Sequence, residues 1–236
     1  MGQPLRILPR CEACCAREQC IFGNLPAPQL ESFNRIRHFH HYKARQTIFH
    51  EGTPALGFHI GCTGRIKLSK ADHNGREQIL RIANPGEIIG EEALLDAQAY
   101  GASAEPLEDC HTAFIERGEF LALLDRGNGI ASRFLLHFCR TLIETQRRLA
   151  RMGLGDARAR LAGTLVDLVQ RYGKPVRGGL QLDLDLSRAE LAALVGLSPE
   201  TAMRLLSEFK SDGILQLDGR RITVLGREKL TALAGP

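Results

Sequence analysis

The apolar residues between positions 131 and 152 recur in alternating steps of four and three. On an α-helix this spacing gathers them into one stripe, the pattern of a coiled-coil seam. The stripe comprises Ala131, Leu135, Phe138, Leu142, Thr145, Leu149 and Met152, and the opposite side carries Arg133, Arg140, Glu144, Arg147, Arg148 and Arg151. A single apolar face also suits a helix that packs on its own domain. We favour a dimer interface formed by Leu135, Phe138, Leu142, Thr145, Leu149 and Met152, because this helix separates two differently patterned halves of the chain.

The residues before this helix alternate between short apolar runs and turns that contain glycine. From about residue 38 to residue 114 this pattern predicts an antiparallel β-barrel or sandwich. Asn74 and Gly75 separate two of the runs, and we expect a hairpin turn here because both residues tolerate a positive φ. Residues 1–27 contain cysteines and prolines without a sustained period and are expected to form a loop, followed by a short helix near residue 30.

The residues after the seam contain two helix starts in close succession. Ser187 and Glu190 have the spacing of a capping box, and Ser198 followed by Pro199 is an N-cap with proline in the first helical position. Gly196 lies between the two helices, which share one apolar face, so a tight helix-turn-helix is predicted.

A hairpin at Asp218-Gly219 follows and completes a winged helix-turn-helix. The fold class is therefore α+β. We divide the chain into a cysteine-rich segment (1–27), a β-barrel (28–130), a dimerisation helix with a glycine hinge (131–155) and a winged helix-turn-helix domain (156–236).

Charge is distributed unevenly along the 236 residues. Residues 1–130 contain 14 Lys and Arg against 16 Asp and Glu, whereas residues 131–236 contain 17 against 11. This mild basic excess suits a polyanionic partner only if a motif supports it. No apolar run approaches the roughly 20 residues of a membrane span, and the N-terminus lacks a secretory h-region, so no membrane partner and a cytoplasmic location are expected.

The second helix of the motif is expected to enter the major groove of DNA. Its outward residues near the start are Glu200, Thr201, Met203 and Arg204. Arg204 is suited to guanine and Glu200 to cytosine, and the two side chains can hold each other in position. The same interface is predicted to include Lys210, Arg220 and Arg221, which would contact phosphate, together with Ser187. The alternative is an ordinary surface ion pair on a helical subdomain.

Four of the seven cysteines lie within the first 20 residues. In a cytosolic chain this density favours metal binding or redox chemistry over a disulfide framework. Cys62 lies in an expected strand and Cys139 in the seam helix, and both are expected to be buried thiols that act as small apolar residues. No nucleophile and base pair or phosphate loop indicates an enzyme, although an iron–sulfur electron carrier or enzyme is the rival from another class.

Two long segments resemble the CRP/FNR family of bacterial transcription regulators. One is LSRAELAALVGLSPETAMRLLSEFKSDGIL, which is similar to the DNA-binding domain of the family. The other is GFHIGCTGRIKLSKADHNGREQILRIANPGEIIGEEALL, which is similar to its cyclic-nucleotide-binding β-barrel, a double-stranded β-helix. The resemblance implies a homodimer with a sensory barrel, a long dimer helix and a winged helix-turn-helix that binds an inverted repeat in double-stranded DNA. It also implies RNA polymerase as a partner and a role as an activator.

The cyclic-AMP branch of the family holds the ribose with a glutamate and the phosphate with an Arg-Ser pair about ten residues later. Glu91 suits the first role, but Gly101 and Ala102 stand where the Arg-Ser pair is expected. A buried phosphate without a cation would be poorly compensated. We therefore expect that the chain does not bind cyclic AMP.

The FNR branch holds a [4Fe-4S] cluster with three N-terminal cysteines and a fourth in the barrel. Cys11, Cys14 and Cys20 reproduce its C-x2-C-x5-C spacing, and the resemblance assigns the fourth position to Cys110. Cys15 is a neighbour that could replace Cys14. Structural zinc and a thiol redox switch are the alternatives to the cluster.

Two residues depart from the FNR pattern. Met203 replaces a serine of the reading helix, which leaves the outer bases of the DNA site open. Thr145 replaces a seam charge that opposes pairing, so dimerisation is expected to be less switch-like.

Overall fold

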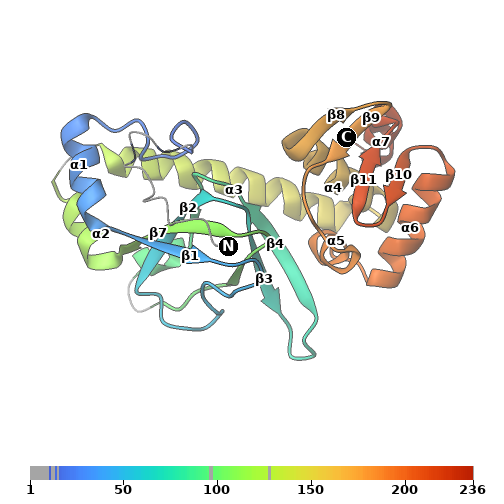
Figure 1. Cartoon of the computed structure of the whole chain (residues 1–236). Helices are drawn as coiled ribbons and strands as arrows, with labels where there is room; N and C mark the ends of the chain where they lie inside the picture. Colours follow the sequence, from blue (N-terminus) through green and yellow to red (C-terminus); the bar gives the residue numbers. More distant parts are fainter. Residues whose placement is uncertain (1–10, 12–13, 15, 96–97, 127–128, 236) are drawn as a thin grey trace, which may run out of the picture. The chain divides into compact units, whose positions relative to one another are not determined.

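The computed structural model describes residues 11, 14, 16–95, 98–126 and 129–235, and it describes Leu154 only by its backbone. These residues form two compact units (Figure 1). One unit contains the residues up to 70 together with 80–141, and the other contains 71–79 together with the residues from 142 onward. Among the described residues, no helix is both long and apolar enough to span a membrane.

The first unit is built on two β-sheets, with strand orders β1-β7-β2-β5 and β4-β3-β6. The strands are β1 (Arg37–Tyr42), β2 (Gly57–Thr63), β3 (Ile66–Ala71), β4 (Glu77–Ala83), β5 (Ile88–Ile89), β6 (Ser103–Pro106) and β7 (Cys110–Glu116). The helical elements are α1 (Ala27–Ile36), the 3-10 turn η2 (Glu91–Leu94), α2 (Arg117–Leu124) and the first part of α3 (Ile130–Leu154). The pairs β1–β7, β2–β7, β2–β5 and β3–β6 are antiparallel, which confirms the predicted β-domain.

The larger sheet separates two apolar cores, because successive residues of a strand point to opposite faces. Phe58 and Ile60 of β2 and Ala113 and Ile115 of β7 share one face, which packs against the helices. We call this the helix-side core, and its other buried members are Cys11, Phe22, Leu25, Leu30, Phe33, Cys62, Ile88, Phe120, Leu123, Ile130 and Phe134. The inter-sheet core consists of Phe49, Ala55, Ile66, Leu68, Ala83, Ile89, Ala93, Tyr100, Ala104 and Cys110.

The hairpin between β3 and β4 forms as expected, but its turn differs in detail. Gly75 has a φ of +75°, whereas Asn74 does not take a positive φ. The Asp72 carboxylate accepts hydrogen bonds from the N–H groups of Asn74 and Arg76 at 2.8 and 2.9 Å. These side-chain bonds hold the turn with a single left-handed residue, Gly75.

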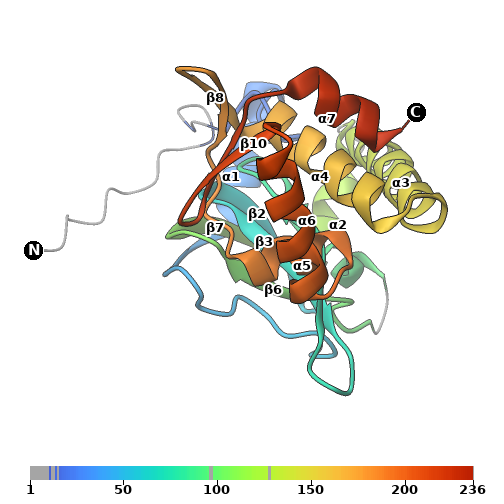
Figure 2. The same ribbon diagram turned by 90° about the vertical axis from the view of Figure 1, so that its right-hand side faces the viewer.

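The second unit contains the winged helix-turn-helix. Its elements are α4 (Ala157–Tyr172), β8 (Gly173–Val176), β9 (Gly179–Leu182), α5 (Arg188–Val195), α6 (Pro199–Ser211), β10 (Leu215–Asp218), β11 (Arg221–Val224) and α7 (Arg227–Ala234). The strands form one sheet in the order β10-β11-β9-β8, and β8 and β9 were not predicted. Figure 2 shows α4 and α7 side by side, and the contacts between these helices agree with that view.

The second half of α3 belongs to this unit and is bonded to it. Arg148 Nη2 donates to the carbonyl oxygen of Leu194 at 3.2 Å, and Arg151 pairs with the Asp167 carboxylate at 2.6 Å. The basic side of α3 is therefore engaged within the chain, whereas the large apolar side chains of the stripe are exposed. The division between the units falls between residues 141 and 142, so α3 contributes to both.

Candidate nucleic-acid interface and thiol site

The two helices of the motif are capped as the sequence predicts. The Ser187 Oγ accepts from the N–H of Glu190 at 3.1 Å, and the Glu190 carboxylate accepts from the N–H of Ser187 at 2.9 Å, which completes the capping box before α5. Gly196 ends α5 with a φ of +76°. Ser198 Oγ then accepts from the N–H of Thr201 at 3.2 Å and starts α6.

Helix α6 buries one face and exposes the other. Its buried residues are Ala202, Leu205, Leu206 and Phe209. Glu200, Met203 and Arg204 are exposed, as expected for residues that reach base edges, and Thr201 is half-buried. Hydrogen bonds from its own backbone N–H and from Ser198 lower the pKa of the Glu200 carboxyl, so this group carries its negative charge at neutral pH.

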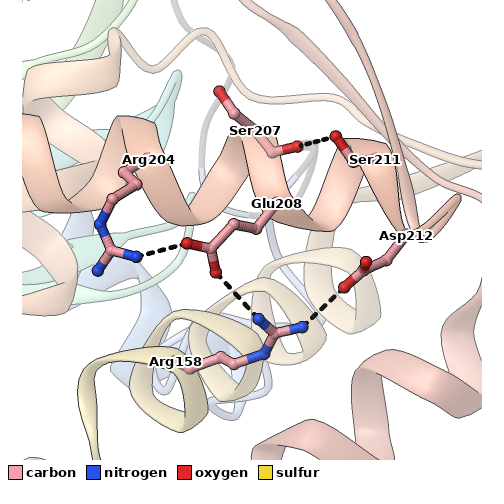
Figure 3. A pocket seen from close by; sticks show the side chains of 6 residues that line it. All are labelled: Arg158, Arg204, Ser207, Glu208, Ser211 and Asp212. Atoms are coloured by element: carbon pink, nitrogen blue, oxygen red, sulfur yellow. Dashed lines mark hydrogen bonds and ion pairs between the residues drawn. The ribbon is translucent and has the colours of Figure 1, made fainter.

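The charged groups around Arg204 are paired differently from the expectation (Figure 3). Arg204 forms an ion pair with Glu208, one helical turn further on, so the predicted pair with Glu200 was wrong. The second carboxylate oxygen of Glu208 accepts from Arg158 Nη1 of α4 at 2.9 Å. Arg158 Nη2 donates to the Asp212 carboxylate at 2.7 Å, so one guanidinium binds the carboxylates of both Glu208 and Asp212.

The wing carries the remaining predicted DNA contacts. Asp218 pairs with Arg221 across the hairpin, so Gly219 and Arg220 form its turn. Arg220 Nη1 lies 3.2 Å from the Asp185 carboxylate, and Arg221 is exposed. Lys210 is exposed at the end of α6, whereas the Ser187 hydroxyl is engaged in the cap and donates to Glu190 at 2.8 Å.

The described residues between Cys11 and Leu25, here called the thiol segment, form consecutive turns. The N–H of Cys14 donates to the carbonyl oxygen of Cys11 at 3.3 Å, and the N–H of Cys20 donates to that of Ala16 at 2.9 Å. Burial raises the pKa of the Cys20 thiol to about 11, a backbone hydrogen bond from Phe22 lowers it, and the nearby thiols of Cys11 and Cys14 raise it further. The three predicted ligands are thus brought together, and Cys15 lies outside the described residues.

The barrel cysteine near this segment is Cys62 and not Cys110. Burial raises the pKa of the Cys62 thiol to about 12, and the thiols of Cys14, Cys20 and Cys11 raise it further. The pKa of Cys110 is raised to about 12 by burial and then by Asp109 and Glu108, with no cysteine of the segment among the causes. The structure therefore does not bring Cys110 together with the other three predicted ligands, because its side chain lies in the inter-sheet core.

One further expectation about the cysteines needs correction. Cys139 is exposed on α3 and is not the buried thiol that was predicted. The thiol segment also contains enough apolar surface to pack on the barrel, since Phe22 and Leu25 are buried in the helix-side core. Within the described part of the chain, no three His, Cys, Asp or Glu side chains have the arrangement of a finished metal site, so the thiols are neighbours rather than a formed cage.

The predicted dimer stripe is exposed along α3. Leu135, Leu142 and Leu149 are 65%, 57% and 69% exposed, and Phe138, Thr145 and Met152 are also on the surface. Leu136 and Ile143, which the sequence analysis did not assign, are exposed beside the stripe and widen it. Their spacing of seven residues was the signal that could have revealed them.

Three acidic side chains, Glu87, Glu91 and Glu92, lie around Arg81 and Gly101. Glu91 lies 3.3 Å from Arg81 Nη2, and Arg81 Nη1 lies 3.1 Å from Glu87. Burial raises the pKa of the Glu92 carboxyl, and this group accepts a hydrogen bond from the backbone of Gly101. A Cβ on Gly101 would lie 2.8 Å from Glu92 Oε1, so the carboxylate is packed directly against this glycine.

Two protein-family models match the chain. A cyclic nucleotide-binding domain matches residues 39–127, and a Crp-like helix-turn-helix domain matches residues 159–233. The chain is 31% identical over 176 residues to the cyclic AMP receptor protein of Thermus thermophilus, which covers 75% of this chain and 78% of that protein. It is 29% identical over 188 residues to the CRP-like cAMP-activated global transcriptional regulator of Mycobacterium tuberculosis, covering 80% and 84%.

Solved structures show the same fold. The c-di-GMP responsive global regulator CLP of Xanthomonas campestris aligns with a TM-score of 0.77 and 26% identity over 85% of this chain and 100% of that chain. FixK2 of Bradyrhizobium japonicum aligns with a TM-score of 0.73 over 85% and 98%, and its 24% identity makes it evidence of fold alone.

The exposed position of Arg204 leads to a prediction about base reading. Arg204→Ala should lose roughly 1–3 kcal/mol of specific DNA binding and relax the preference at one base pair, because a bidentate contact to guanine is lost. Glu200→Ala should relax a neighbouring position. Selection of sites from a random duplex pool, followed by affinity measurements, checks both. Unchanged affinity and specificity in both variants would show that α6 is not the reading helix.

The ion pair in Figure 3 leads to a second prediction, that Glu208 positions Arg204. Glu208→Ala should lower the ratio of specific to non-specific DNA affinity, because Arg204 loses its neighbour, while the removal of a negative charge should not weaken non-specific binding. Asp212→Ala is the matched control, since it removes the other partner of Arg158 and leaves the pair with Arg204 in place. Equal ratios in the two variants would contradict a positioning role.

Proposed function

Since the chain belongs to the CRP/FNR family of DNA-binding transcription regulators, we propose that it acts as a homodimer whose DNA binding responds to oxygen through a [4Fe-4S] cluster. The observation that carries this proposal is the gathering of Cys11, Cys14 and Cys20 on the barrel core from which α3 starts. The family indicates a DNA-binding regulator, and these thiols are the basis for proposing a metal-bound redox signal.

The proposed DNA target is an inverted repeat. A dimer of winged helix-turn-helix domains presents two copies of α6, and two-fold symmetry of the protein requires two-fold symmetry of the site. The exposed Glu200 and Arg204 read the bases, while Lys210 and Arg221 contact phosphate. RNA polymerase is the proposed protein partner on the promoter.

The homodimer is proposed to form through the stripe on α3. Seven large apolar side chains of this helix are exposed, among them Leu135, Leu142 and Leu149. A patch of this kind is unusual on an isolated monomer and typical of a surface that pairs. Since the stripe repeats with the heptad spacing, a second copy of α3 is its natural partner.

The cluster is proposed from the chemistry of its ligands. Soft thiolates select iron–sulfur clusters or zinc, and the residues of the thiol segment fit either group. When bound, a [4Fe-4S] cluster supplies an oxygen-labile centre, whereas zinc would supply a structural one. Metal analysis of the protein separates these alternatives and a thiol switch without metal.

The chain itself connects the thiol segment to the dimer helix. Arg133 of α3 donates from Nη2 to the carbonyl oxygen of Asn24 at 2.9 Å, and the ring of Phe134 lies 5.6 Å from that of Phe22. Displacement of the segment would therefore alter the contacts at the start of α3 directly. This route does not pass through Cys110. Because Phe22 holds the segment without metal, the response is partial.

Cyclic AMP is proposed not to be the signal. Arg81 is the cation that pairs with Glu91 among the described residues, and its guanidinium is already engaged by Glu91 and Glu87. Glu92 occupies the backbone donor at Gly101, where the phosphate of a nucleotide would need it. A phosphate there would meet a carboxylate and not a cation.

The acidic residues Glu87, Glu91 and Glu92 lead to a prediction about ligand binding. Cyclic AMP should produce no binding heat in calorimetry at micromolar concentration and no change in DNA affinity. A saturable binding isotherm in that range would overturn the assignment, whatever its effect on DNA. A cyclic-AMP-binding relative, measured in the same buffer, serves as the positive control.

The proposed signal leads to a prediction about oxygen. Anaerobic protein should be mainly dimeric and bind a palindromic site, and air exposure or Cys20→Ser should shift part of the population to monomer and weaken DNA binding. Dimer dissociation and DNA binding are thermodynamically linked, so both measurements should move together. Sedimentation and binding assays on the three samples test this.

The variant Arg133→Ala tests how the signal reaches α3 separately from metal binding. It should take up metal like the wild-type chain but lose part of the difference between anaerobic and air-exposed protein, because its bonds to Ile21 and Asn24 are absent. If anaerobic protein, air-exposed protein and Cys20→Ser dimerise and bind DNA alike, oxygen control is refuted.

A further inference from the structure

Cys62 occupies an irregular position in β2. Gly61 pairs with Thr112 of β7 and Thr63 pairs with His111, so Cys62 is an extra residue between two pairs. Such a β-bulge re-aims a side chain, and bulges are frequent beside functional sites. Here Cys62 is buried in the helix-side core, on the face of the sheet that the thiol segment covers.

The thiol segment lies against the loop that neighbours Cys62. Cys11 is a member of the helix-side core and Cys20 packs against that core. Gly86 N–H donates to the carbonyl oxygen of Gly61 at 2.7 Å, and a Cβ on Gly86 would lie 2.9 Å from the backbone nitrogen of Cys20. Cys20 therefore touches a loop that is hydrogen-bonded to the residue preceding Cys62.

Cys110 lies on the other face of the same sheet. It pairs with Tyr42 of β1, is fully buried in the inter-sheet core, and its Cβ lies 2.7 Å from where a Cβ on Gly64 would be. Besides burial, the thiols of the thiol segment raise the pKa of Cys62, whereas the pKa of Cys110 is raised by its acidic neighbours Asp109 and Glu108. The sheet separates Cys110 from the thiol segment, so of these two barrel cysteines Cys62 is the one that can join the segment.

We propose that Cys62 is the fourth thiolate of the metal site, together with Cys11, Cys14 and Cys20. This inference rests on the proposed function, because it takes a thiolate-bound metal as given, and it replaces Cys110 in the ligand set. On binding, each of the four S–H bonds is replaced by a bond from sulfur to metal, and the four protons go to solvent. Iron and sulfide come from the reconstitution mixture.

Arg37 fits a centre of this kind. Its Nη1 donates to Cys11 Sγ at 2.8 Å, and its buried Nε has no hydrogen-bond partner among the described residues. Hydrogen bonds to sulfur stabilise and tune iron–sulfur centres, and a nearby cation offsets part of the negative charge of the thiolates. The guanidinium therefore lies beside the proposed ligands, and its Nε–H is a further donor for a sulfur atom.

The test compares two buried cysteines by substitution. Wild-type chain, Cys62→Ala and Cys110→Ala are purified without metal, checked for folding by circular dichroism, and reconstituted anaerobically with iron and sulfide. Wild type and Cys110→Ala should hold about four iron and four sulfide per chain. Cys62→Ala should lose its cluster to a chelator at least roughly tenfold faster than the wild-type chain. Removal of a residue that only hydrogen-bonds to a metal ligand already weakens metal binding roughly tenfold or more, and removal of a ligand itself should cost no less.

A cobalt titration gives a second readout that does not depend on iron. The intensity of the sulfur-to-cobalt charge-transfer band reports the number of thiolates, so it should fall in Cys62→Ala and remain unchanged in Cys110→Ala and in the exposed control Cys139→Ala. If Cys62→Ala does not fold, Cys62→Ser takes its place, with the same expected loss, because its hydroxyl is nearly isosteric but a poor ligand for soft metals.

The outcomes separate this inference from the proposed function. A full cluster in Cys62→Ala with loss in Cys110→Ala overturns the inference and leaves the proposed function standing. Uptake of zinc but not of iron and sulfide, with dependence on Cys62, supports the inference and overturns oxygen sensing through a cluster. A wild-type chain that binds neither metal overturns both.

Discussion

The larger sheet of the first unit has two buried faces, and the period of two along each strand decides which core a side chain can reach. Phe58 and Ile60 face the helices, whereas His59 between them packs near Phe49 on the other side. A shift of one residue in the strand register would move each set of side chains to the opposite core. Cys62 lies two residues beyond Ile60, so the same alternation places its thiol on the helical side, where the barrel can offer a sulfur to the segment that covers this face.

Aromatic contacts join that face to α3. The ring of Phe22 stacks on Phe33 with 4.2 Å between centroids and lies 5.6 Å from Phe134, whose ring is 5.7 Å from Phe138 on the exposed stripe. Truncation of a buried phenylalanine typically costs about 3–5 kcal/mol, so these contacts hold the thiol segment in place whether or not metal is bound. In the proposed regulator, a signal from the thiols would therefore act on a packed segment and give a graded response at the proposed dimer surface.

Features that depend on local chemistry were predictable from the sequence, and features that depend on the third dimension were not. The capping box of Ser187 and the inward side of Ala202 follow from spacing along one helix, and both are confirmed. The face on which Cys110 lies depends on how β7 is paired and on which face of the sheet the helices cover, and neither leaves a mark in the cysteine spacing. Strands β8 and β9 are four residues each and contain proline or glycine, so their alternation was too short to recognise.

The pairing of Arg204 was ambiguous for a different reason, since residues four positions before and after it are both acidic. The structure selects Glu208 because Arg158 holds that carboxylate from α4. An exposed ion pair of this kind contributes no more than about 1 kcal/mol, whereas a correct guanine contributes roughly 1–3 kcal/mol. Arg204 can therefore leave Glu208 for the right base at little cost, and Arg158 still compensates the carboxylate that remains near the phosphates. At a wrong base the exchange gains nothing, and this difference makes the pair a contributor to specificity rather than to affinity.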